Sequence, residues 1–283
     1  MTCIEDLHGL TLSAGSHKSW VDGVCLMEAC SWMVGEPWSD HPTCVSPVLV
    51  AYGRALNDSL PHDLRQVLKW TIPQLLNTAD DGLDEARGFL AVDWLIRVYT
   101  PEWLRLISGL VVDADRLASL PSLATAEGVS KITGCVSEAA DHADAALAAT
   151  LAVAGASGTY GQARVSTKAT GWGTAASARD AATQALAVSG TARAVTEAAG
   201  AGAHTIASLA ANKAAAGAAR VAAVRATATV PDHTAARDAA VARLAPTVTW
   251  LHRASIDLFE QMIDPVGPAH AMISGVVSAD SGL

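Results

Sequence analysis

Positive charge is scarce in this sequence. Its 19 lysines and arginines stand against 28 aspartates and glutamates, which gives a formal net charge of −9 at pH 7. No stretch collects basic residues, so nothing would replace the counterions of a nucleic-acid backbone. We therefore expect no binding to nucleic acid, and the acidic balance instead favours solubility.

Long apolar runs are also missing. The longest uncharged stretch, residues 145–163, contains serine, glycine, tyrosine and glutamine and is too polar for a membrane span. The opening residues MTCIEDLHGL lack the basic region and apolar run of a secretory signal. The five cysteines are an odd number, which favours free thiols. We expect no membrane insertion and a cytoplasmic location.

Aromatic residues make up only 5% of the chain, and they are unevenly spread. Six of the eight tryptophans lie before residue 104. Between residues 139 and 245 about 40% of the positions are alanine, far above ordinary usage. Alanine has the highest helix propensity, yet it buries little area. These features predict an all-α protein with an aromatic N-terminal core and a thinly stabilised alanine-rich region.

Local signals predict individual helices. Gly35 is placed to end a helix over residues 24–34, and Ser46-Pro47 begins another that reaches about residue 57. A third helix opens near residue 59 and ends or kinks before Pro73. The later expectations are a long helix over 83–99 and a short one capped by Thr100-Pro101.

The apolar stripe near the end of the chain needs a partner. Val248, Leu251, Leu258 and Met262 share one helical face, and only the N-terminal helices are apolar enough to cover it. We expect this helix to pack on residues 47–107. The prediction is thus a helical bundle with an alanine-rich helical insertion. Its parts are residues 1–123, 124–244 and 245–283, the last ending in a loose tail.

Chemistry-bearing side chains concentrate between Ser16 and Pro47. Two histidines and two cysteines there have the ligand chemistry of a zinc site. They are His17, Cys25, His41 and Cys44. The alternative is that both cysteines are small buried apolar residues and both histidines are polar loop residues, with no cofactor bound.

The same stretch has the inventory for nucleophilic catalysis. Cys25 lies near a helix start, where the helix dipole is expected to lower its pKa. His17 or His41 could act as the base. The carboxylates available to orient that base are Glu28, Asp22 and Asp40.

A third interpretation is a polar binding patch. An acidic, tryptophan-bearing loop between helices could hold a small cationic or sugar-like ligand. The patch would consist of Glu28, Glu36, Trp38, Asp40 and His41. The alternative is a solvated loop in which Trp38 covers the core.

Other polar clusters are assigned structural positions. The acidic group at residues 80–85 is expected to form a turn and a helix N-terminus, where negative charge is favourable. On the last long helix, His252 and Asp257 are expected on the exposed face.

The block SHKSWVDGVCLMEACSWMVGEPWSDHPTCVSPV resembles an uncharacterised all-helical family of actinobacteria and their bacteriophages. The family pattern is SH…GxCxME…GExxSDxPxCxxPV, followed by a helix like AVDWLIRVYTPEWL. The resemblance covers about residues 1–110 and, through APTVTWLHRASIDLFEQMID, residues 245–265. It implies one helical core formed by the two ends and a phage-related origin, and it implies no activity. The insert departs from the family's richer Ala-Trp pattern, because it retains only Trp172.

These observations favour a non-enzymatic interaction or structural protein. Its alanine-rich helices would serve self-association or contact with a protein partner. The alternatives are a zinc- or cysteine-dependent enzyme and a small-molecule binding protein, each with its site in residues 17–44.

Overall fold

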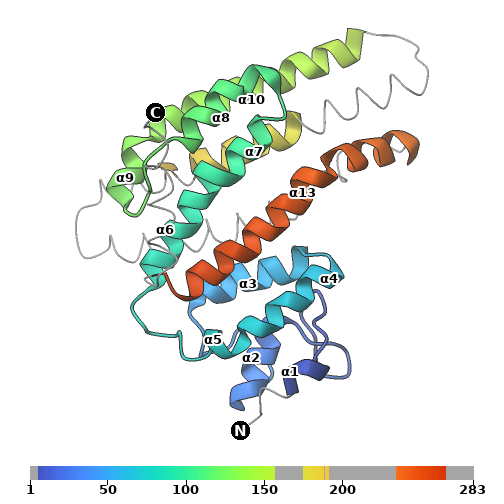
Figure 1. Cartoon of the computed structure of the whole chain (residues 1–283), viewed down its shortest axis with the longest axis vertical. Coiled ribbons are helices and arrows are strands. Elements are labelled where there is room, and N and C mark those ends of the chain that lie inside the picture. The colour runs from blue at the N-terminus through green and yellow to red at the C-terminus, as the bar shows by residue number, and fades with distance from the viewer. Residues whose placement is uncertain (1–5, 157–174, 188, 191–233, 266–283) are drawn as a thin grey trace, which may run out of the picture.

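The computed structural model describes residues 6–156, 175–187, 189–190 and 234–265 (Figure 1). Within these ranges the chain forms helices and connecting segments and no β-strand, so the all-α prediction is confirmed. No helix in the described ranges is long and apolar enough to cross a membrane. Much of the predicted insertion, and the tail expected to be loose, lie outside them.

The N-terminal helices form the first group. They are α1 (Asp6–Gly9), α2 (Leu26–Val34), α3 (Pro47–Ser59), α4 (His62–Arg65), the 3-10 helix η1 (Gln66–Thr71) and α5 (Ile72–Leu75). Helix α2 packs on both α3 and α5. The helix expected between residue 59 and Pro73 is divided into three short elements, because the η1 segment interrupts the α-helical geometry.

The ends of α2 and α3 follow local rules. Ser46 caps α3 by accepting a hydrogen bond from the Leu49 N–H, and Pro47 occupies a first-turn position. Gly35 ends α2 in the left-handed region with φ 76°. Helix α2 begins at Leu26, later than expected, because Cys25 is its N-cap.

The second group is built around a long continuous helical path. It comprises α6 (Asp84–Trp94), a π-helical turn η2 (Leu95–Tyr99), α7 (Thr100–Leu104), η3 (Ser108–Leu110), α8 (Val111–Ala118), α9 (Ala126–Lys131) and α10 (Thr133–Ala156). The prediction that Thr100-Pro101 caps a separate short helix is wrong, because the helical path continues through both residues. The wide π turn accommodates the proline ring at position 101, and the Thr100 hydroxyl donates to the Leu95 carbonyl at 2.8 Å.

Helix α13 (Thr234–Ile263) runs between the two groups and contacts α3 and α6, so the expected contact of the last helix with residues 47–107 is present (Figure 1). The Phe259 ring stacks on Tyr52 with centroids 5.8 Å apart, and the Tyr52 hydroxyl donates to the Ser255 carbonyl at 3.1 Å. Gly53 leaves room for this ring, since a Cβ there would lie 3.0 Å from Phe259 Cζ. The side chains of α13 thus complete the core that the N-terminal helices begin.

Residues 175–187 of the alanine-rich region pack inward. In residues 175–187 four alanines are buried in the main core, at positions 178, 181, 182 and 185. Thr100 also donates to the Ala181 carbonyl at 3.3 Å. The division that makes residues 124–244 a separate part of the molecule stays a prediction.

Two polar residues are more deeply buried than the sequence indicates. His252, expected on an exposed face, is only 6% exposed and its Nε2 has no hydrogen-bond partner in the described structure. Burial lowers the pKa of His252, because the charged ring would lose its hydration. Arg87, on α6, is fully buried; it pairs with Asp81 and Asp84 and donates to a carbonyl at the end of α13. The acidic residues therefore lie at a helix start as expected, and they also pair with a buried arginine.

Candidate functional site

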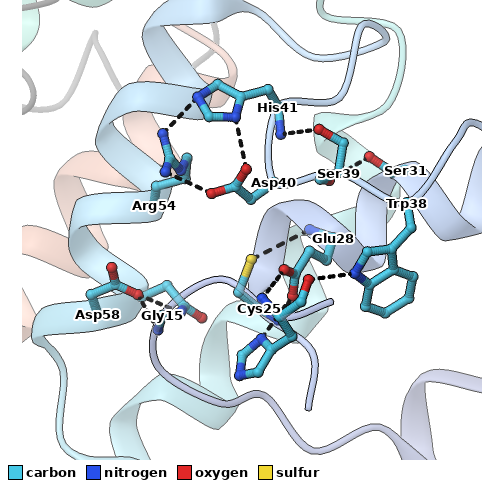
Figure 2. Close-up of polar contacts among 12 residues, drawn as sticks. Gly15, Cys25, Glu28, Ser31, Trp38, Ser39, Asp40, His41, Arg54 and Asp58 are labelled. Carbon is cyan, nitrogen blue, oxygen red and sulfur yellow. Dashed lines mark hydrogen bonds and ion pairs between the residues drawn. The ribbon is translucent and has the colours of Figure 1, made fainter. Parts of the chain in front are cut away.

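The Glu28 carboxylate organises the loop before α2. It is 1% exposed. Its Oε1 accepts from the backbone N–H of His17, and its Oε2 accepts from the Cys25 N–H at 2.7 Å and from His17 Nδ1 at 2.9 Å. The Glu28 N–H in turn points to Cys25 Sγ at 3.5 Å, which completes a capping box (Figure 2). These bonds satisfy the buried carboxylate and fix the loop of residues 17–25.

Cys25 does not have the chemistry expected of a nucleophile. Burial, together with the neighbouring Glu28 carboxylate, raises the pKa of its thiol to about 12. The expectation that the helix dipole would lower this pKa is wrong, because desolvation outweighs the favourable backbone N–H groups. The thiol stays protonated at neutral pH.

We expect Cys25 to be alkylated by iodoacetamide at pH 8 roughly a thousandfold more slowly in the folded protein than in the unfolded chain. The factor follows from a pKa of about 12 against the ordinary 9.0, since only the thiolate reacts. Peptide mass spectrometry after timed quenching, with and without urea, measures both rates. Equal rates in the two states would contradict the assigned burial.

A second group of polar side chains lies on α3 and the preceding loop. Arg54 donates from Nη2 to Asp40 Oδ2 at 2.6 Å and from Nη1 to His41 Nε2 at 2.7 Å. His41 Nδ1 lies 2.7 Å from Asp40 Oδ1. Because the guanidinium is only a donor, His41 accepts at Nε2 and carries its proton on Nδ1. Asp40, His41 and Arg54 thus form a closed hydrogen-bonded ring (Figure 2).

The predicted zinc ligands are not brought together. His17 is held by Glu28 beside Cys25, whereas both ring nitrogens of His41 are engaged by Asp40 and Arg54. Cys44 is half-buried, and burial together with the nearby Glu36 raises its thiol pKa to about 11. In the described part of the chain, no three His, Cys, Asp or Glu side chains are arranged to hold a metal ion. The spacing in the sequence therefore did not translate into a ligand cluster.

The predicted polar patch is also divided. Glu28 is interior, and Glu36 accepts from the N–H and hydroxyl of Thr43 at 2.8 and 2.6 Å. Trp38 instead bonds to the loop before α2: its Nε1 donates to the His17 carbonyl at 2.9 Å. The five residues lie in one region but do not face one ligand.

Three tryptophans form a surface of their own. The Trp20 ring lies 4.8 Å from Trp32 and 6.1 Å from Trp38, measured between centroids. Trp20 is 46% exposed and Trp32 is 36% exposed, and Val21 beside them is 93% exposed. We call Trp20, Trp32 and Trp38 the tryptophan surface. It is an aromatic cluster left open to solvent.

A pocket of about 370 Å³ is lined in part by the loop that connects α2 and α3. Its walls come from residues 41–45, the first turns of α3 and the turn at residues 79–80. The Ala79 N–H donates to the Cys44 carbonyl at 3.3 Å, and the Ser46 N–H donates to Thr78 Oγ1 at 3.0 Å. These bonds join the walls, so the pocket is a built feature of the fold.

The sequence pointed to residues 16–47 but did not indicate several residues that take part in these clusters. Trp20, Trp32 and Arg54 carry no motif, although three tryptophans within residues 20–38 are a signal of an aromatic cluster. Asp80 reaches the pocket from a distant turn, which no local pattern indicates. No protein-family model, curated protein or solved structure matches this chain, so the resemblance to an actinobacterial and phage family stays a prediction.

Proposed function

We propose that this is a non-enzymatic interaction protein whose tryptophan surface binds a second copy of the chain. The observation that carries the proposal is the contact of two partly exposed rings, Trp20 and Trp32, beside the exposed Val21. Tryptophan is enriched at the centre of protein interfaces, where it contributes much of the binding energy. Isolated exposed apolar residues need no explanation, but a cluster of this kind does.

The rigidity of the surface supports binding. Trp38 is anchored by its indole N–H to the His17 carbonyl, and His17 is held at two nitrogens by the buried Glu28. The loop that presents Trp20 is therefore ordered before any partner arrives. Association would lose little conformational entropy, which favours affinity.

Charge supports a second copy as the occupant. Lys18 and Asp22, on either side of Trp20, are exposed and of opposite sign. A two-fold arrangement can place Lys18 of one copy against Asp22 of the other, and these pairs would offset part of the repulsion between two copies that each carry a net charge of −9. Trp20 and Trp32 are each less than half exposed, so they offer less area than the roughly 800 Å² per partner of a standard interface, and we expect a weak dimer.

The proposal moves self-association away from the alanine-rich helices. In residues 175–187 the buried alanines already pack in the core of the same chain. A cytoplasmic location belongs to the proposal as well. It is supported by Cys25, Cys30, Cys44 and Cys135, all unpaired in the part of the chain that the structure describes.

Sedimentation equilibrium from micromolar to near-millimolar concentration tests the proposal. We expect the average mass of the wild type to rise toward that of a dimer, and the Trp20→Ser/Trp32→Ser variant to remain monomeric. Trp70→Ser is the matched control, since Trp70 is 45% exposed and also contacts another ring, that of His8. A wild type that stays monomeric, or a control that dissociates equally, would overturn self-association through this surface.

A further inference from the structure

We propose that the 370 Å³ pocket between the 41–45 loop, α3 and the 79–80 turn binds a small zwitterion with an aliphatic body, such as a free aliphatic amino acid. Arg54 would hold the carboxylate and Asp80 the ammonium group. This site is separate from the tryptophan surface and does not depend on self-association.

Arg54 is prepared to bind an anionic group. Two of its five N–H donors are used by Asp40 and His41, which fix the guanidinium plane. The side chain is 39% exposed and lines the pocket, so its remaining donors are accessible. A planar guanidinium held in this way matches a carboxylate.

Asp80 supplies the opposite charge. Its carboxylate is exposed at the pocket and makes no hydrogen bond or ion pair within the described structure. The residue has a left-handed backbone with φ 58°, and the neighbouring Ala79 N–H fixes the turn by bonding to Cys44. Such a conformation is uncommon outside glycine, although aspartate and asparagine tolerate it.

The pair of charges selects the ligand class. Asp80 would repel a simple anion, and a simple cation would leave the remaining N–H donors of Arg54 without an acceptor. A molecule that carries both charges satisfies each group.

The remaining lining restricts the body of the ligand. Val45, Val50 and Ala51 provide an aliphatic wall, and among the described residues the His41 imidazole is the only aromatic ring in the lining. Its volume lies at the lower end of the range for small-molecule sites, roughly 300–1,000 Å³. A branched aliphatic side chain fits this space better than an indole.

Isothermal titration of the full chain with leucine tests the site. N-acetylleucine and leucinamide are the comparison ligands, because each lacks one of the two charges. We expect leucine to bind and each derivative to bind at least about tenfold more weakly, as for the loss of one charge-assisted hydrogen bond. No binding of leucine at millimolar concentration, or equal binding of all three ligands, would overturn the proposal.

The variant Asp80→Asn assigns the ammonium contact. Asparagine adopts the left-handed backbone as readily as aspartate, so thermal unfolding should be unchanged. We expect a loss of leucine affinity of about tenfold or more. Asp63→Asn is the matched control, because Asp63 is an exposed carboxylate on α4 that does not line the pocket. An equal effect of both variants would contradict the site, while Trp20→Ser/Trp32→Ser should bind leucine normally whether or not the protein dimerises.

Discussion

Replacing Arg87 by methionine is expected to lower the free energy of unfolding by about 2–4 kcal/mol, because it removes a buried guanidinium and its charge-assisted hydrogen bonds while Asp81, which is 24% exposed, keeps part of its hydration. Arg87 is fully buried, and its Nη1 and Nη2 donate to the two oxygens of Asp81 at 2.7 and 2.6 Å. Its Nε donates to the Met262 carbonyl at 2.9 Å. Methionine fills similar space but leaves the carboxylate and the carbonyl without this donor.

The position of Arg87 explains why the effect should be global. The last carbonyls of a helix have no partner within that helix. Arg87 belongs to α6, yet it reaches the carbonyls of Met262 and Ile263 at the end of α13, the latter at 3.3 Å. One side chain therefore joins helices that are about 175 residues apart in sequence. Its loss should loosen α13 and the core that Phe259 completes.

Urea unfolding followed by circular dichroism measures the change. Arg105→Met is the matched control. Arg105 also meets two carboxylates, Glu102 and Asp115, but it is 39% exposed, so we expect less than about 1 kcal/mol. If Arg87→Met does not fold, Arg87→Lys keeps the charge and should retain an intermediate stability. Equal effects at positions 87 and 105 would contradict the stabilising role assigned to the buried Arg87 side chain.

The same pair predicts a component of acid sensitivity. Hydrogen bonds from Arg87 hold the pKa of Asp81 below its ordinary value of 3.8. The unfolded chain therefore takes up the proton first as pH falls. The stability that the pair contributes is complete above the unfolded pKa and is lost as pH falls through the folded one. Arg87→Met should lack this loss between pH 4 and pH 2, which urea titrations in that range would show.

Local signals predicted the parts of the fold that depend on neighbouring residues. The cap at Ser46 and the helix end at Gly35 need only a hydroxyl and a residue that accepts positive φ. The stripe on the last helix also predicted its contact with α3 and α6, because few other segments could cover so large an apolar face.

Long-range pairing could not be predicted in the same way. The periodic pattern of α6 shows Arg87 as a charge three residues from Asp84, which is ordinary on an exposed helix face. Its burial depends on the distant carbonyls of α13. His252 was misplaced for the related reason that the neutral imidazole can be buried where a charged side chain would not be.

The candidate site shows the same limit. The sequence indicated residues 16–47, since histidine, cysteine and tryptophan are concentrated there, but it could not assign partners. The ring of Asp40 and His41 needs Arg54 from the next helix, and the pocket needs Asp80 from a turn beyond it. Cys25 lies close to the predicted start of its helix, but burial raises the pKa of its thiol, which is opposite to the predicted shift.

Glu28→Gln is the second substitution with a large expected effect, about 2–4 kcal/mol of unfolding free energy. Glu28 accepts three hydrogen bonds, two from backbone N–H groups of His17 and Cys25 and one from the His17 ring. Glutamine has nearly the same shape but replaces one acceptor oxygen with an NH₂ group. At least one buried donor then faces another donor, which is costlier than a simple loss of the bond.

The Glu28→Gln substitution also connects the interior to the proposed interface. His17 supplies the carbonyl that anchors Trp38, and Trp38 contacts Trp20. Releasing His17 should therefore free the tryptophan surface, so dimerisation should weaken along with stability. Urea unfolding monitored by tryptophan fluorescence and sedimentation of the same variant measure both effects.

Glu36→Gln provides a matched control for this substitution. Glu36 also receives two hydrogen bonds, from the N–H and hydroxyl of Thr43, but it lies near the surface, where water can replace them. We expect less than about 1 kcal/mol of destabilisation and unchanged dimerisation. If Glu28→Gln had no larger effect than Glu36→Gln, the buried carboxylate would not hold the loop, and the rigidity argued for the tryptophan surface would need another origin. A destabilised Glu28→Gln variant that still dimerises normally would instead separate the interface from the network beneath it.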